Sequence, residues 1–297
     1  QMYLDQIEGF LPEYLANILL DHDFDAERSF RERGINRSVR FIACSGIVKN
    51  QILMKQIQDI MQLLQKEYEY PVDIEFTVNL SETGEYSINL LQCRPLKVFK
   101  DIGKAQIPED IAEEKIILEN VHSSMGLSRN VKIDHIVLVD SIAYYNMPYA
   151  KKPNVAKLIG TINWKYKGKN KHMLLMVPGR IGTSSPELGV PTTFADISEF
   201  EAICEIEEKK AGYNPELSYG SHIFQDLVEA EILYTAVFAN EKTLRFAPEK
   251  LAEYPDIVSL FTEDPELKQV VHVYDMSKVS CELCNDLQNE RLVLYQQ

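Results

Sequence analysis

Apolar and polar residues alternate strictly through VDIEFTVN, residues 72–79. Successive side chains of an extended strand point to opposite faces of a sheet, so the apolar residues share one face and the polar residues share the other. This period of two predicts a half-buried β-strand. Turn-forming residues follow at 81–85, and residues 86–94 again have strand composition. The sequence therefore predicts an antiparallel hairpin.

The expected register of this hairpin brings four polar side chains together. If the turn centres between the two residues 83–84, Glu75 lies opposite Gln92, and Asp73 lies opposite Arg94. All four side chains then share one face, with cross-strand neighbours about 5 Å apart. A register shift of one residue would move Gln92 and Arg94 to the other face. The prediction therefore depends on an even-numbered turn.

Carboxylate, amide and guanidinium groups on one face are the chemistry of a metal–nucleotide site. Carboxylate and amide oxygens are suitable ligands for Mg²⁺, and arginine binds phosphate oxygens in a bidentate manner. The alternative is a solvated face that carries an ordinary Asp–Arg cross-strand pair. The spacing alone leaves both interpretations open.

Two motifs and a helix resemble the end of the ATP-grasp domain in the phosphoenolpyruvate synthase / pyruvate phosphate dikinase family. That family ends the domain with a DIEF or DIEW strand, a short turn and an LQ-x-RP strand. This chain has DIEF at 73–76 and LQCRP at 91–95, and an amphipathic helix is expected at 52–68. The resemblance extends over residues 48–98.

The resemblance implies a kinase-type transferase that splits ATP and passes a phosphoryl group toward pyruvate. It implies that Glu75 and Gln92 hold Mg²⁺, that these two residues with Asp73 and Arg94 bind the nucleotide, and that Arg94 is the catalytic contact to phosphate. Mg²⁺ and ATP are the implied cofactors. ATP and pyruvate or phosphoenolpyruvate are partners through the parent protein, and we expect this chain alone to be inactive. The rival hypothesis is a non-catalytic regulatory or interaction module with a vestigial nucleotide site.

Residues 1–47 show no convincing counterpart of the second ATP-grasp subdomain. They are predicted to form helices around a charged segment, FDAERSFRERGINRSVR (24–40). The arginines of this segment either contact a phosphate, or form a solvated face or a surface toward upstream domains of a larger protein. They are Arg28, Arg31, Arg33, Arg37 and Arg40.

The predicted fold class is α+β or α/β, with a partial ATP-grasp subdomain followed by a compact mixed α/β domain. We expect residues 1–100 to form the first part, 101–120 a linker with a helix at 108–120, and 121–297 an appended domain of unknown role. In this last part, short apolar runs predict buried strands and the segments between them predict helices. The strands are expected at 132–140, 172–178, 202–208 and 231–239, and the helices at 155–166 and 221–231.

PGRIGTSSPELGVP (178–191) is a glycine-rich loop that follows a predicted strand. Gly179, Arg180 and Gly182 form a candidate anion loop, because backbone N–H groups and a guanidinium bind anions. A long ordered structural loop accounts equally for the glycines and prolines, and we favour it. This loop and SYGSHIFQDL (218–227) resemble a region downstream of the ATP-grasp segment in large bacterial phosphoenolpyruvate synthase-like proteins, which indicates the parent protein and no activity.

Two further motifs are assigned no chemistry. His222 follows Gly-Ser in a segment that weakly resembles a phosphohistidine loop, but the paired glycines of such loops are missing, so we predict that it is not phosphorylated. Cys281 and Cys284 form a lone CxxC. Zinc needs two further ligands, of which the nearby His272 supplies only one, so we treat the pair as structural.

Charge and composition restrict the remaining classes. The net charge of −14 argues against a nucleic-acid partner. No apolar run reaches the roughly 20 residues of a membrane helix, so no membrane partner is expected. Five scattered cysteines are typical of a reducing compartment, which predicts a cytoplasmic location. The first residue is Gln, and we expect the chain to be an excised piece of a longer protein that contacts upstream domains.

Overall fold

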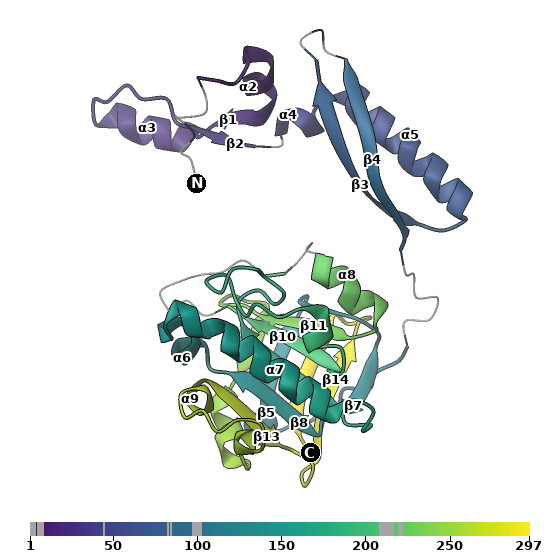
Figure 1. The fold of residues 1–297 in the computed structure, drawn as a ribbon, viewed down its shortest axis with the longest axis vertical. Coiled ribbons are helices and arrows are strands. Elements are labelled where there is room, and N and C mark those ends of the chain that lie inside the picture. Colours follow the sequence, from purple (N-terminus) through teal and green to yellow (C-terminus); the bar gives the residue numbers. More distant parts are fainter. Residues whose placement is uncertain are drawn as a thin grey trace. The chain divides into compact units, whose positions relative to one another are not determined.

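The computed structural model describes residues 4, 9–43, 45–81, 83, 85–96, 103–207, 217–218 and 222–297. The chain divides into two compact units, Gln1–Val98 (unit 1) and Phe99–Gln297 (unit 2). Each is a mixture of helices and sheets (Figure 1), as an α+β fold requires. No helix in these described ranges is long and apolar enough to cross a membrane.

Unit 1 consists of a set of short elements followed by a long helix and a hairpin. The long helix, the hairpin and the presence of helices in the first part are confirmed, but the two short antiparallel strands that pair between these helices were not predicted. In chain order the elements are α2 Glu13–Leu19, β1 Leu20–His22, α3 Phe24–Glu32, β2 Arg40–Ile42, α4 Ser45–Val48, α5 Gln51–Tyr68, β3 Val72–Leu80 and β4 Tyr86–Pro95.

Helix α5 has defined ends and packs against β3 (Figure 1). The Asn50 side chain caps its first turn by accepting a hydrogen bond from the Leu53 N–H, at 3.0 Å. The helix ends at Tyr68, and the capping residue Glu69 adopts a left-handed conformation with φ 54°. Among the described residues of unit 1, only Leu53 and Val72 are buried hydrophobic side chains. The core of this unit is therefore small.

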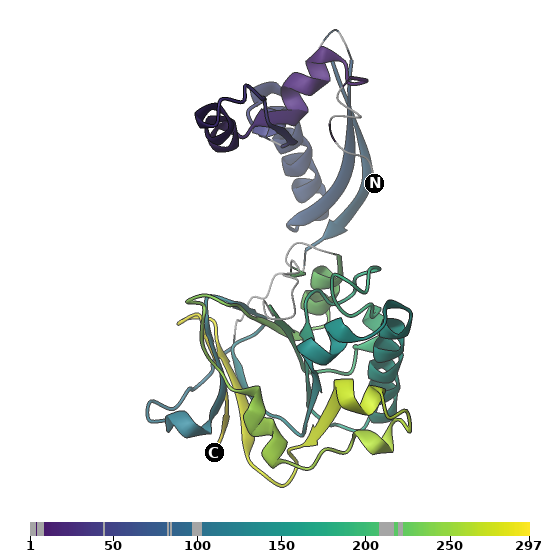
Figure 2. The same ribbon diagram turned by 90° about the vertical axis from the view of Figure 1, so that its left-hand side faces the viewer.

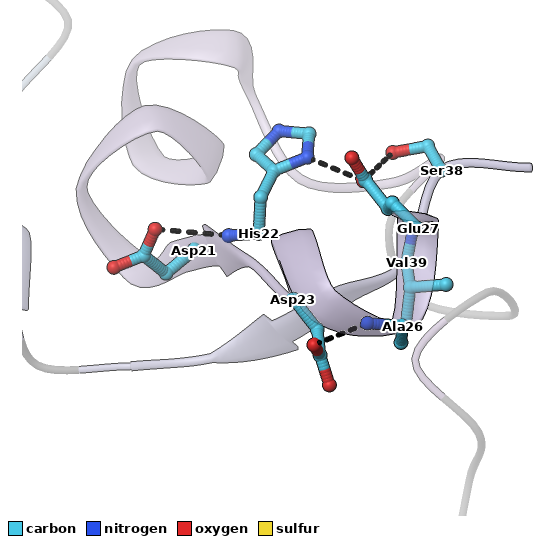
Figure 3. A network of polar contacts seen from close by, with 7 residues as sticks. All are labelled: Asp21, His22, Asp23, Ala26, Glu27, Ser38 and Val39. Atoms are coloured by element: carbon cyan, nitrogen blue, oxygen red, sulfur yellow. Dashed lines mark hydrogen bonds and ion pairs between the residues drawn. The ribbon is translucent and has the colours of Figure 1, made fainter. Parts of the chain in front are cut away.

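Glu27 on α3 joins the short elements of unit 1 (Figure 3). Its Oε1 accepts hydrogen bonds from the Val39 N–H at 2.9 Å and from Ser38 Oγ at 3.1 Å, and it lies 2.8 Å from His22 Nδ1. The hydrogen bond with His22, followed by those of the other two donors, lowers the pKa of Glu27 from 4.5 to about 2. Asp23 caps the same helix through the Ala26 N–H, at 2.9 Å.

Unit 2 is built from three layers (Figure 2). Its middle layer is a six-stranded mixed sheet of order β13-β8-β9-β10-β11-β6, in which β8 to β11 run parallel. Its second sheet is antiparallel, with the order β12-β5-β15-β14-β7. The strands are β5 Ile116–Val121, β6 Ser124–Met125, β7 Arg129–Lys132, β8 His135–Val139, β9 Met173–Pro178, β10 Ala202–Ile206, β11 Leu233–Val237, β12 Thr243–Phe246, β13 Val271–Asp275, β14 Cys281–Asp286 and β15 Arg291–Gln296.

Helices cover one face of the middle sheet, and the second sheet covers the other. Alternate residues of β8 enter two different cores: Val137 and Val139 pack toward the helices, while Ile136 and Leu138 pack toward the second sheet. The helices are α6 Ser141–Asn146, α7 Lys152–Tyr166, α8 His222–Glu229 and α9 Leu267–Val270. The four predicted strands and both predicted helices of this region are present.

The helix expected at 108–120 is wrong. The structure has a short 3₁₀ helix at Glu113–Lys115 and then strand β5. Ile117 and Leu118 are buried in the core between the two sheets, and Ile116 is buried in a small cluster on the outer face. A continuous apolar run of this kind is compatible with a helix or a buried strand, and the proline at position 108 suggested a helix start.

The CxxC motif lies on strand β14. Residues three apart on a strand point to opposite faces, so Cys281 enters the core between the two sheets and Cys284 enters a small cluster on the outer face. Burial raises the pKa of each thiol to about 12. The two sulfurs therefore belong to separate apolar environments and form no common site.

The Glu27 network predicts an acid-sensitive start of unit 1. Because the folded pKa of about 2 lies below the free value of 4.5, its stabilisation is complete above pH 4.5 and is lost as the pH falls toward 2. Glu27→Gln should therefore accelerate hydrogen exchange at Val39 and in β1 and β2 at neutral pH. Asp25→Asn is the matched control, since the Asp25 side chain is 92% exposed. Equal exchange in both variants would contradict the assigned role.

Candidate functional site

The polar residue pairs of the hairpin are arranged as the sequence predicts, but through a different turn. Glu75 lies opposite Gln92, and Asp73 lies opposite Arg94. Beyond this point Phe76 pairs with Leu90, and the remaining pairs centre on residue 83. The predicted turn centre between 83 and 84 is therefore wrong by half a residue; Gly84 itself lies outside the described residues.

A β-bulge reconciles the odd-numbered turn with the predicted pairs. The register shifts between Glu75 and Phe76, so that Leu91 is an extra residue on β4. Without this shift Glu75 would face Leu91, and both Gln92 and Arg94 would lie on the other face. The sequence contains the signal. Apolar residues occupy the even positions 86–90 of this strand, but polar residues occupy the next two even positions.

The four side chains place two carboxylates, one amide and one guanidinium next to one another on one face. Arg94 Nη2 lies 3.6 Å from Asp73 Oδ2, and these side chains are 29% and 33% exposed. The amide of Gln92 lies between Glu75 and Arg94. With its nitrogen toward Glu75 Oε1 and its oxygen toward Arg94 Nε, it makes two contacts of 3.3 Å. The face is thus half-open, with a guanidinium and two carboxylates within reach of a ligand.

The donor set fits a hard cation only in part. A half-turn of the Gln92 amide would place its oxygen 3.3 Å from Glu75 Oε1, so that both oxygens face one point. Mg²⁺ prefers oxygen ligands and retains several waters. The part of the chain that the structure describes contains no group of three or more His, Cys, Asp or Glu side chains able to hold a metal. Phosphate oxygens and water would have to supply the other ligands.

The candidate anion loop turns its amides toward the protein itself. The N–H of Gly179 donates to the Ile206 carbonyl and that of Arg180 donates to the Leu188 carbonyl, each at 2.9 Å. The next N–H, of Ile181, donates to Glu205 Oε1 at 2.7 Å. These amides are therefore committed to protein acceptors, which favours the structural interpretation of the loop.

Gly182 is required by packing and by backbone conformation. Its φ is 69°, and a Cβ at this position would lie 2.3 Å from the Ile223 Cδ1 atom of α8. The glycine lets the loop approach that helix closely. His222, the first residue of α8, is exposed, and residues 219–221 before it lie outside the described residues. That His222 is not phosphorylated stays a prediction.

A buried carboxyl group that was not predicted from the sequence, Glu205, lies on β10. This side chain is fully buried and accepts hydrogen bonds from the N–H groups of Ile181 and Ser218 and from the hydroxyl of Tyr234, each at 2.7 Å. Burial raises the pKa of Glu205 above 4.5, although these hydrogen bonds oppose the shift. A single acid inside the otherwise apolar strand AICEI is the sequence signal that predicts such a group.

A protonated Glu205 accounts for both contacts of the Ser218 hydroxyl. Its Oε1 lies 2.5 Å from Ser218 Oγ, and that oxygen lies 3.1 Å from the Ile181 carbonyl. A hydroxyl has one proton. A neutral Glu205 can donate to Ser218 Oγ, which then donates to the carbonyl. Through these hydrogen bonds Glu205 connects strand β10 to Ser218 and to the loop that begins after β9.

Replacement of Glu205 should destabilise unit 2. Glu205→Leu leaves buried donors unpaired and should cost at least about 3 kcal/mol, while Ser218→Ala and Tyr234→Phe should each cost about 1–3 kcal/mol. Urea unfolding followed at Trp164, the single tryptophan of the chain, reports on α7 of this unit. Glu241→Leu in an exposed turn is the control. A loss no larger than that of the control would contradict this role.

The same cluster predicts a pH dependence of stability. The folded pKa of Glu205 is raised, so its contribution to stability is complete below pH 4.5 and is lost as the pH rises through the raised value. Glu205→Gln has no titrating carboxyl group, so its free energy of unfolding should vary less with pH above 4.5 than that of the wild type. If the free energies of unfolding of the two proteins varied with pH in the same way, Glu205 would be ionised in the folded state at all these pH values, and the prediction would be contradicted.

Residues 18–115 match the family model of the pyruvate phosphate dikinase AMP/ATP-binding domain. No curated protein and no solved structure matches the chain. The match begins upstream of the stretch in which the motifs were found and includes α3 and its arginines, all of which are exposed. The predicted resemblance is therefore confirmed: over residues 18–115 this chain is similar to the nucleotide-binding domain of the phosphoenolpyruvate synthase / pyruvate phosphate dikinase family.

Proposed function

We propose that the polar face of the β3–β4 hairpin binds the phosphates of ATP, together with Mg²⁺, within a phosphoenolpyruvate synthase-like phosphotransferase. The observation that carries the proposal is the placement of Asp73, Glu75, Gln92 and Arg94 on one face. This face lies inside the segment that matches an AMP/ATP-binding domain. Phosphoryl transfer toward pyruvate rests on the family resemblance alone.

Each of the four side chains has a distinct role in the proposal. Arg94 binds a phosphate oxygen through its guanidinium, and Asp73, at 3.6 Å, orients it. Glu75 and Gln92 each offer one oxygen to the metal after the amide turns. When bound, the metal would neutralise charge that develops on the phosphates. The residues of this chain thus bind and orient the nucleotide.

Binding by this face alone should be weak. The hairpin offers two or three oxygens and one guanidinium on an open surface, whereas tight sites bury most of their ligand. We expect a dissociation constant of millimolar order or weaker, equivalent to about −4 kcal/mol at best. The turnover of ATP would then need the other half of the nucleotide site.

Two substitutions should weaken binding in different ways. Arg94→Ala should reduce ATP binding with and without Mg²⁺, because the guanidinium meets phosphate directly, whereas Glu75→Ala should chiefly reduce the enhancement that Mg²⁺ gives. Asn89→Ala is the matched control, since Asn89 lies on the same face further along β4, opposite Thr77. Calorimetry with ATP, in the presence and absence of Mg²⁺, measures all three variants.

The outcomes separate the competing hypotheses. Micromolar binding by the wild type would indicate a more complete site, one that includes the exposed arginines between residues 28 and 40. Weak binding that neither substitution changes would contradict the nucleotide proposal. It would favour a non-catalytic interaction module in which this face is vestigial.

A further inference from the structure

Unit 2 contains a pocket of about 330 Å³ at the ends of its parallel strands. The last residues of β8 and β10 form its floor, and residues of α6, β12, β13 and the 3₁₀ segment Pro248–Glu253 form its walls. In sheets of parallel strands, ligands bind beyond the carboxyl ends of the strands. The pocket therefore lies where such a sheet offers a site. All of its lining residues belong to unit 2, so the inference drawn from it does not use the proposed nucleotide site.

Acidic and neutral polar groups line this pocket, and no lysine or arginine does so among the residues described. The acids are Asp140 and Glu249. The neighbouring Lys250 is turned away, because its ammonium donates to the carbonyl oxygens of Glu114, at 2.5 Å, and Ile116, at 3.1 Å. The local charge is thus negative, and an anionic ligand would be repelled.

Several lining groups have unused hydrogen-bonding capacity. Tyr274 is only 8% exposed, and its hydroxyl makes no hydrogen bond to any residue that the structure describes. Burial, and then the charges of Asp256 and Asp140, raise its pKa. His272 stacks on the same ring, and its Nδ1 lies 2.8 Å from Asp256 Oδ2, so Nε2 is the nitrogen left for a ligand. One oxygen of Asp140 accepts the Ala143 N–H, and among the described residues no hydrogen bond occupies the other.

We propose that this pocket binds a small organic cation, namely a protonated amine attached to an apolar body. Carboxylate oxygens and a histidine nitrogen accept hydrogen bonds from the ammonium group. The rings of Phe246 and Tyr274 and the aliphatic wall contact the apolar part. A bare metal ion fits poorly, because the described residues hold no cluster of three or more acidic, histidine or cysteine ligands.

Three ligands that share a phenethyl group and differ in charge test this assignment on the whole chain. They are phenethylammonium, neutral 2-phenylethanol and anionic 3-phenylpropionate, followed by saturation-transfer NMR and titration. We expect phenethylammonium to bind with millimolar affinity or better and the other two to bind at least about tenfold more weakly. An absence of phenethylammonium binding, or equal binding of all three, would overturn the proposal.

Two variants locate the binding to the pocket. Glu249→Gln keeps the shape of an exposed side chain and should weaken phenethylammonium binding about tenfold. Glu253→Gln is the matched control, because Glu253 lies on the same 3₁₀ segment without lining the pocket. Tyr274→Phe should also weaken the binding, and its thermal unfolding verifies that the fold persists. Equal effects of the two glutamate substitutions would place the cation elsewhere and refute the site.

Discussion

Burial of both faces of the six-stranded sheet is the constraint on which unit 2 depends. Every residue of β8, β9, β10 and β11 is buried, since helices cover one face and the second sheet covers the other. A polar side chain inside these strands must find partners. Glu205 has four hydrogen bonds, and Thr235 accepts one from Asn120, at 2.9 Å. Groups that line the pocket are consequently found beyond the ends of these four strands and on the edge strand β13.

The sequence predicts those elements whose apolar pattern is local. The alternation at 72–79 and the helical period at 52–68 give the hairpin and α5, and short apolar runs give the parallel strands of unit 2. The strand β5 was missed because its buried run has no alternation to distinguish it from a helix. The pairing of strands into two sheets joins segments far apart in the chain, so local patterns do not predict it.

The candidate sites also differ in how far local sequence patterns predict them. The pairing of Glu75 with Gln92 was predicted from a period of two and an even-numbered turn, but the structure reaches it through an odd-numbered turn and a bulge. The surroundings of Glu205 could not be predicted, because its donors come from a loop, a segment after β10 and strand β11. The pocket beside His272 likewise collects residues from six separate elements. These residues lie next to one another only in the folded sheet, so the sequence alone did not predict the pocket.

The bulge at Leu91 has a consequence for how this hairpin tolerates insertions and deletions. Surface turns usually accept a change of length, because the strands beside them are unaffected. Here a turn with an odd number of residues and one surplus strand residue compensate each other, so a single-residue indel in the turn alone would exchange the two faces of β4 near Arg94. Length variation among relatives should therefore occur in coupled pairs, one change in the turn and one at the bulge.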